Sequence, residues 1–263
     1  MDGTRSDASH EIANRHWVDA FRDLVDDMGG EFRRFGEVDT FVTSLPMPFA
    51  NGCLVVNPCD ADDLDTAVAW VKAAGVPYQV RVDEPLVPAL QGTLDRHGLE
   101  SEPMPMPAMV LSPIPAIPAP AAGVSVTRVD DAGYGTFLAI LVSTGIPNEL
   151  AVRIFPRHLI ESDNGAYFVA TLDGDPAGIS VAVRTGESGG IYSVATLEQA
   201  RRRGVGSAVT WAAIDAIRGW GCTSAVLQSS EVGYPMYRSM GFVEVTRYVR
   251  FAPATGGSPL TDP

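Results

Sequence analysis

The chain has 263 residues, of which 46% are apolar, and a formal net charge of −13 at pH 7. This length suits one large domain or two small ones, and the acidic balance argues against nucleic acid, which requires a basic surface, as a partner. No apolar run approaches the roughly 20 residues of a membrane-spanning helix, and residues 1–11 lack the apolar segment of a secretion signal, so we expect a cytoplasmic protein without membrane contact.

The first part of the chain alternates between helical and extended patterns. Apolar residues at helical spacing predict a first helix that ends at Gly29-Gly30. A second helix has acidic residues in its first turn, and Pro85 and Gly98 bracket a third. The expected helices cover residues 17–28, 62–74 and 85–97, and the expected strands residues 41–45, 53–57, 78–82 and 109–111.

A proline-rich stretch divides the chain. Residues 112–122 contain four prolines and no charged residue, which is typical of a stiff, extended connector. We therefore expect an N-terminal domain over residues 1–111 and a C-terminal domain over residues 123–251. Residues 252–263 are rich in Gly, Pro, Ser and Thr and are expected to form a flexible tail.

The C-terminal half alternates more regularly. The expected strands cover residues 124–129, 166–172, 177–184, 190–196, 224–228 and 243–251, and the expected helices residues 137–142, 149–160, 204–220 and about 235–239. A strand, a helix, a glycine and another strand recur in both halves, around residues 78–99 and 225–242. Duplication of one α+β unit and coincidence both explain this echo.

Two common kinds of site are not indicated. The three cysteines, Cys53, Cys59 and Cys222, have no metal-ligand spacing and predict buried, reduced thiols. No two histidines are four residues apart, so we expect no metal site. Lys72 is the only lysine, and no glycine run precedes it, which excludes a Walker-type phosphate loop.

The run of residues 201–206, Arg-Arg-Arg-Gly-Val-Gly, lies between an expected strand and an expected long helix. A helix N-terminus offers unpaired N–H groups and a favourable dipole to an anion. Glycine allows a close approach of the backbone, and arginine forks suit phosphate oxygens. A solvated helix start explains the run less well, because cations oppose the helix dipole there.

Residues 124–251 resemble the GNAT superfamily of acyl-CoA-dependent N-acyltransferases. The family's cofactor motif matches residues 201–206, and its second motif matches Tyr237 with the pair Gly241-Phe242. The resemblance implies an α+β fold of two GNAT-like domains, each a mixed, mostly antiparallel sheet flanked by helices. The N-terminal copy is expected to be degenerate, because residues 57–63 contain aspartates where the glycine motif would lie.

The resemblance implies acetyl-CoA as the co-substrate and no metal. Its pyrophosphate is expected on the amides of the glycine run, and its pantetheine arm beside the preceding strand. Because aspartates would repel a pyrophosphate, we expect one acetyl-CoA per chain. The implied cofactor-binding residues are Val194, Ala195, Thr196, Arg201, Arg202, Arg203, Gly204, Val205, Gly206, Ser207, Ser229 and Tyr237.

Tyr237 matches the family's general acid, which protonates the departing thiolate, although a core aromatic role is an alternative. Many relatives carry a glutamate on the cofactor strand, but residues 188–193 contain no carboxylate. Water held by Ser193 or Tyr192, or the carboxylate of Glu149, are the candidates for the base, and Glu187 lies in the preceding turn.

We therefore expect an N-acetyltransferase that transfers an acetyl group to a primary amine by direct attack in a ternary complex. A non-catalytic CoA-binding sensor and an acyltransferase with a larger acyl donor are the alternatives. Most of the negative charge lies in residues 1–120. An acidic surface favours cationic amines by long-range attraction without choosing among them. A homodimer is left open.

Overall fold

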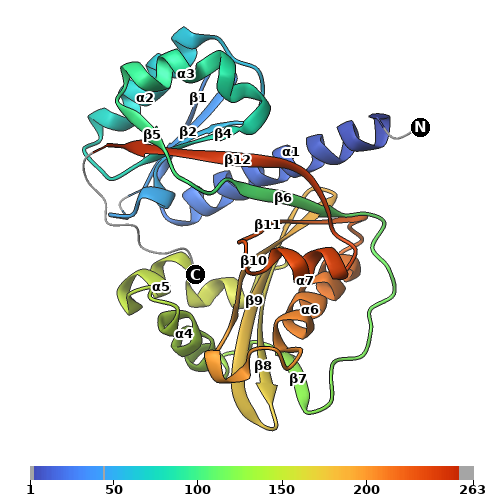
Figure 1. The fold of residues 1–263 in the computed structure, drawn as a ribbon. Helices are drawn as coiled ribbons and strands as arrows, with labels where there is room; N and C mark the ends of the chain where they lie inside the picture. The colour runs from blue at the N-terminus through green and yellow to red at the C-terminus, as the bar shows by residue number, and fades with distance from the viewer. Residues whose placement is uncertain (1–2, 44, 255–263) are drawn as a thin grey trace. The chain divides into compact units, whose positions relative to one another are not determined.

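The computed structural model describes residues 3–43 and 45–254, which form two compact units (Figure 1). The C-terminal unit contains residues 3–16 and 109–243, and the N-terminal unit contains residues 17–108, without residue 44, and 244–254. Helix α1 (Gly3–Asp27) therefore contributes to both units. Each unit is thus built from more than one segment of the chain.

The N-terminal unit is a five-stranded mixed sheet with an additional short strand. The strand order is β1-β2-β3-β4-β12, and β5 pairs with β12. Strands β3 and β4 are parallel, and the neighbouring pairs on either side are antiparallel. The strands are β1 (Glu31–Phe35), β2 (Val38–Val42), β3 (Gly52–Val55), β4 (Gln79–Asp83), β5 (Leu99–Ser101) and β12 (Val243–Pro253).

Two helices, α2 (Ala61–Ala73) and α3 (Val87–Arg96), cover this sheet (Figure 1). Their apolar faces pack on strand residues such as Val80 and Val82 in one hydrophobic core. Two 3₁₀ turns, Pro48–Ala50 and Glu84–Leu86, complete the connections. The apolar side of α2 that its sequence predicts is buried, because Leu64, Val68 and Val71 lie in this core.

The C-terminal unit holds the sheet β11-β10-β9-β8-β7. All neighbouring pairs are antiparallel except β10 and β11, which are parallel. Strand β6 (Met106–Leu111) crosses from one unit into the other. The remaining strands are β7 (Val124–Arg128), β8 (Gly165–Leu172), β9 (Asp175–Thr185), β10 (Ser188–Thr196) and β11 (Ser224–Gln228).

Helices lie on both faces of this sheet (Figure 1). On one face, α6 (Val205–Gly219) packs with α7 (Tyr234–Ser239) around Ile191 and Leu227. On the other face, α4 (Tyr134–Ser143) and α5 (Asn148–Ile154) pack on Tyr167, Ile179 and Val181. The short 3₁₀ segments are Arg157–Glu161 and Glu198–Ala200.

Both units contain one parallel strand pair joined through a helix. In the N-terminal unit α2 connects β3 to β4, and in the C-terminal unit α6 connects β10 to β11. The loop from β3 to α2 is therefore the counterpart of the loop from β10 to α6. The expected mixed, mostly antiparallel α+β fold is confirmed.

The structure differs from the expected elements in several places. Helix α1 begins at Gly3, well before the first apolar residue of its predicted face. The strand β1 was not expected, because its residues are mostly exposed and charged. The predicted helix over residues 149–160 ends at Ile154, since Pro156 cannot continue it and a 3₁₀ segment follows.

The proline-rich residues 112–122 do more than connect. Ile114 and Ile117 are partly buried against the core of the C-terminal unit. The compact units change at residues 16/17, 108/109 and 243/244, while the division into functional domains over residues 1–111 and 123–251 stays a prediction. Strand β12 also includes Ala252 and Pro253, the first residues of the expected tail. Residues 255–263 of that tail lie outside the described residues.

His16 ties α1 to strand β10 within the C-terminal unit. Its Nδ1 lies 2.6 Å from the Thr185 hydroxyl and 2.9 Å from the Ser188 hydroxyl, and its ring stacks on Tyr192. A β-carbon added at Gly190 would lie 2.2 Å from His16 Nε2, so the imidazole fills the space that a side chain at Gly190 would occupy. Burial lowers the pKa of His16 to about 3, which keeps the ring neutral.

The close approach at Gly190 predicts a stability cost for Gly190→Ala. The added methyl group would overlap His16 Nε2 and the Tyr192 ring, 2.2 and 2.6 Å away, and such overpacking costs about 1–3 kcal/mol in the free energy of unfolding. Gly135→Ala is the matched control, because no atom lies near its added methyl group and α4 should gain about 0.5–1 kcal/mol. Urea denaturation measures both; equal stability of the two variants would contradict the packing described for Gly190.

The buried imidazole also predicts a pH dependence. The unfolded chain binds a proton at His16 below about pH 6.5, while the native protein does so only below about pH 3. The free energy of unfolding should therefore fall between these pH values, by up to about 1.4 kcal/mol per pH unit from this group. His16→Gln should show a shallower fall than the wild type in denaturation curves recorded from pH 7 to 4. Parallel pH curves for the two proteins would show that His16 is not held neutral.

Candidate functional site

The connection from β10 to α6 has a left-handed backbone at two positions. Gly204, the residue that caps α6, has φ 84°, and Arg202 has φ 62°. A non-glycine residue in this region costs on the order of 1–3 kcal/mol and is typical of functional sites. Turns with left-handed residues can point successive backbone N–H groups into one concave surface that binds anions.

Groups of positive character surround this turn. The first N–H groups of α6 have no partner within the helix, and no side chain caps them. Arg201 and Arg202 are exposed. Within the part of the chain that the structure describes, neither forms an ion pair. The Arg203 guanidinium lies 3.5 Å from the carboxylate of Asp173 in the β8–β9 turn. Two arginine forks beside unpaired amides can therefore receive a phosphate group.

The end of strand β10 is irregular and is paired with β9 alone. Its pairing with β9 shifts between Tyr192 and Ala195, and Ser193 has φ 50°. Its parallel pairing with β11 covers only Ser188 to Gly190. Beyond that point the two strands share no recorded pairs among the described residues, so Val194 to Thr196 present a free strand edge. Such an edge accepts an extended chain with amide groups through main-chain hydrogen bonds.

Tyr237 lies on α7, after β11. Its side chain is buried, and its ring meets the edge of Phe242 at a centroid distance of 5.9 Å. Burial raises the pKa of the Tyr237 hydroxyl above its ordinary value near 10, because the phenolate would lose its hydration. The hydroxyl therefore stays protonated at neutral pH and can donate a proton.

The other expected site residues have different surroundings. Ser193 lies within the irregular segment of β10, beside Val194. Ser229 is buried after β11 and its hydroxyl donates to the Ser230 carbonyl, 2.7 Å away. Glu149 is exposed in the first turn of α5, and no hydrogen bond or ion pair joins it to β10 among the described residues. The position of the His16 imidazole against β10 was not predicted; the adjacent Gly189-Gly190 within a strand is a local signal of the space that the ring fills.

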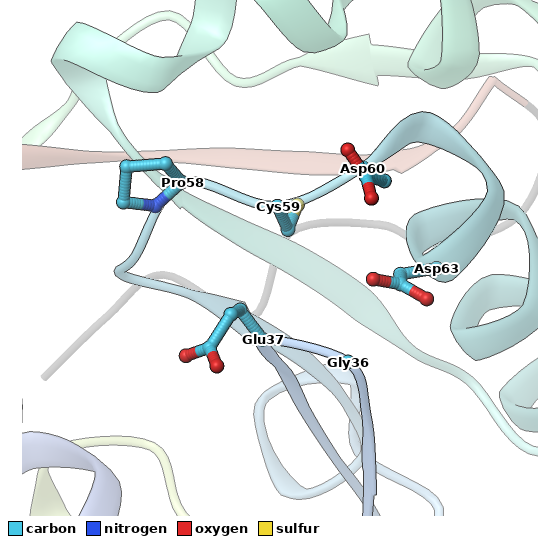
Figure 2. A pocket seen from close by; sticks show the side chains of 6 residues that line it. All are labelled: Gly36, Glu37, Pro58, Cys59, Asp60 and Asp63. Atoms are coloured by element: carbon cyan, nitrogen blue, oxygen red, sulfur yellow. The ribbon is translucent and has the colours of Figure 1, made fainter.

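The counterpart loop in the N-terminal unit has the opposite charge. Gly36, Glu37, Pro58, Cys59, Asp60 and Asp63 line a hollow of about 290 Å³, and Figure 2 shows their side chains. Burial raises the pKa of the Cys59 thiol to about 11, and the charges of Asp63, Asp60 and Glu37 act in the same direction. A field that opposes a thiolate also opposes a pyrophosphate. This loop is therefore less suited to an anion than the β10–α6 turn.

In the described residues no group of three or more His, Cys, Asp or Glu side chains could hold a metal ion. Residues 3–43 and 45–254 also contain no helix that is long and apolar enough to cross a membrane.

Comparison with known proteins gives the architecture a family context. Residues 143–242 match the model of the acetyltransferase (GNAT) family. The sequence has no significant match among curated proteins. A GCN5-related N-acetyltransferase from Kribbella flavida is 20% identical, with a TM-score of 0.75 over 93% of this chain and 96% of its own. A GCN5-related N-acetyltransferase from Sphaerobacter thermophilus is 17% identical, with a TM-score of 0.62 over 86% of this chain and 84% of its own.

A tandem GNAT protein from the clavulanic acid biosynthesis pathway is 16% identical, with a TM-score of 0.59 over 85% of this chain and 80% of its own. At these identities the likeness concerns the fold. The segment that matches the family model contains the β10–α6 turn, the free edge of β10 and Tyr237. Residues 143–242 are therefore similar to the GNAT family, and the fold of the chain is like that of these GNAT proteins.

Proposed function

We propose that the protein transfers an acetyl group from acetyl-CoA to a primary amine by direct attack in a ternary complex. Members of the GNAT family use acetyl-CoA. The single observation that carries the proposal is the left-handed turn at Arg202 and Gly204, which adjoins the free edge of β10. The turn suits the pyrophosphate of CoA, and the free strand edge suits its amide-containing pantetheine arm. The edge and the turn follow one another along the chain, as the arm and the pyrophosphate do in CoA.

The residues present fit this co-substrate. The N–H groups from Arg202 to Ser207, with the guanidinium groups of Arg201 and Arg202, would hold the pyrophosphate. The backbone of Val194, Ala195 and Thr196 would pair with the pantetheine arm as an added strand. A backbone N–H of the irregular segment of β10 would donate to the thioester oxygen and stabilise the negative charge that develops there.

In the proposed reaction the nitrogen–carbon bond of the amide forms as the carbon–sulfur bond of the thioester breaks. The buried Tyr237 hydroxyl gives its proton to the departing sulfur. The amine must lose a proton before or during attack. We propose two groups for this step: Ser193, acting through a water molecule, and Glu149. Because Glu149 is exposed, we favour Ser193.

The missing strand carboxylate favours a second function. Strand β10, from Ser188 to Thr196, contains no acidic residue, so a CoA-binding sensor without catalysis is the rival. A donor with a larger acyl group is a variant of the enzyme function.

The acidic surface would attract cationic amines as acceptors. The proposal also includes a cytoplasmic location and a single CoA site, in the C-terminal half.

Calorimetric titration with acetyl-CoA tests the binding site. We expect one acetyl-CoA per chain. Gly204→Ala should raise the Kd at least about tenfold, because an alanine would have to adopt φ 84° and its β-carbon would lie 2.8 Å from the Ala121 methyl group. Gly186→Ala is the matched control, since Gly186 also has positive φ but lies in open space in the β9–β10 turn. Two acetyl-CoA molecules per chain, or equal binding by both variants, would refute the proposed site.

Release of the CoA thiol in the presence of a broad amine panel tests the chemistry. Tyr237→Phe should lower kcat by about 10²-fold, because it removes the proton donor, and should leave the Kd of acetyl-CoA within about twofold. Tyr234→Phe, one turn earlier on α7, is the control and should retain its kcat. If the wild type binds acetyl-CoA and acetylates no amine, the enzyme function is wrong and the sensor function is supported.

A further inference from the structure

A cavity separates the proline-rich segment from α6. Residues 117–121 line one side and α6 lines the other, and the volume of this open groove is about 300 Å³. All the lining residues belong to the C-terminal unit. We call residues 112–122 the strap and this cavity the strap groove. Its size is at the lower end of the range found for small-molecule sites.

The strap groove begins at the proposed phosphate site. Gly204 and Ser207, in the first turn of α6, line both. From Ser207 the groove continues past Trp211 to Asp215, residues that are four apart and therefore share one side of the helix. This distance is roughly 12 Å along the helix axis. A molecule whose phosphate lies at the N-terminus of α6 can therefore extend directly into the groove.

The walls of the groove have a distinct chemistry. Proline, alanine and valine residues (Pro118, Pro120, Ala119 and Val126) line it together with Trp211. Among the described residues no lysine or arginine lines it. The Ser207 hydroxyl and the carboxylate oxygen Oδ2 of Asp215 offer hydrogen-bond acceptors, while Asp215 Oδ1 accepts from Arg218, 2.7 Å away. Such a site suits a flat, uncharged heteroaromatic ring with N–H or O–H donors, and it does not suit a phosphate.

We propose that the strap groove binds the adenosine end of the acyl-CoA donor. This inference rests on the proposed function, because it requires CoA to be bound at the β10–α6 turn. The purine packs between the strap and Trp211, as aromatic rings and bases stack on indoles, and Asp215 accepts a hydrogen bond from the exocyclic amine or a ribose hydroxyl. The 3′-phosphate stays outside, where the exposed Arg201 and Arg202 can neutralise it.

Two donors of different length test the assignment. Acetyl-CoA contains the adenosine, while acetyl-4′-phosphopantetheine keeps the acyl arm and one phosphate but lacks it. Calorimetry gives the Kd of each. The wild type should bind acetyl-CoA more tightly than the shorter donor. Ala119→Phe, which fills the groove from its exposed wall, should raise the Kd of acetyl-CoA about tenfold, the usual size of one stacking interaction, and leave that of the shorter donor unchanged.

Ala116→Phe is the matched control, because Ala116 is also exposed in the strap but does not line the groove. A second pair, Trp211→Ala against Trp220→Ala, removes an indole of α6 inside and outside the groove, with thermal melting to verify folding. Equal binding of both donors by the wild type, or an equal change in both Kd values in Ala119→Phe, overturns the inference while acetyl-CoA binding stands. If the wild type binds neither donor, the proposed function fails and this inference fails with it.

Discussion

The short parallel pairing of β10 with β11 is the constraint on which the proposed site depends. Because the ladder is recorded only from Ser188 to Gly190, the last residues of β10 keep one edge of their backbone free. The shift in register beside Ser193 then redirects the strand just before it ends. Backbone groups on a free strand edge pair with water or with a ligand, and the proposed site uses this edge for the amide groups of the donor.

The two units show how charge selects among similar loops. The β3–α2 and β10–α6 connections both join a parallel strand to a helix N-terminus, which favours anions in either case. The first is lined by Glu37, Asp60 and Asp63, and the second is flanked by three arginines. Two unit charges 4 Å apart interact by about 4 kcal/mol near a protein surface. The interaction of one charge with a helix dipole is worth about 0.3–1 kcal/mol. Repulsion by several carboxylates therefore outweighs the attraction of an anion to one helix N-terminus.

Local requirements made part of this site predictable from the sequence. A left-handed cap needs glycine, so Gly204 stands out between a strand pattern and a helix pattern, and Tyr237 lies at a fixed spacing before Gly241-Phe242. Contacts between residues far apart in the sequence produce no such local pattern. His16 meets Ser188 172 positions along the chain, and β12 pairs with β4 and β5 of the N-terminal unit. Periodicity describes one element at a time and does not specify its partner.

The proline-rich segment, residues 112–122, shows how packing between residues far apart in the sequence affects the proposed site. Its composition predicts a stiff spacer, and stiffness is also what a wall requires, since proline loses little conformational entropy when it is held in place. With Ile114 and Ile117 packed on the core and Ala121 against Gly204, the strap restricts the backbone at the turn that the proposed phosphate site uses. A segment that joins two halves of the chain thereby also shapes the proposed donor site in one of them.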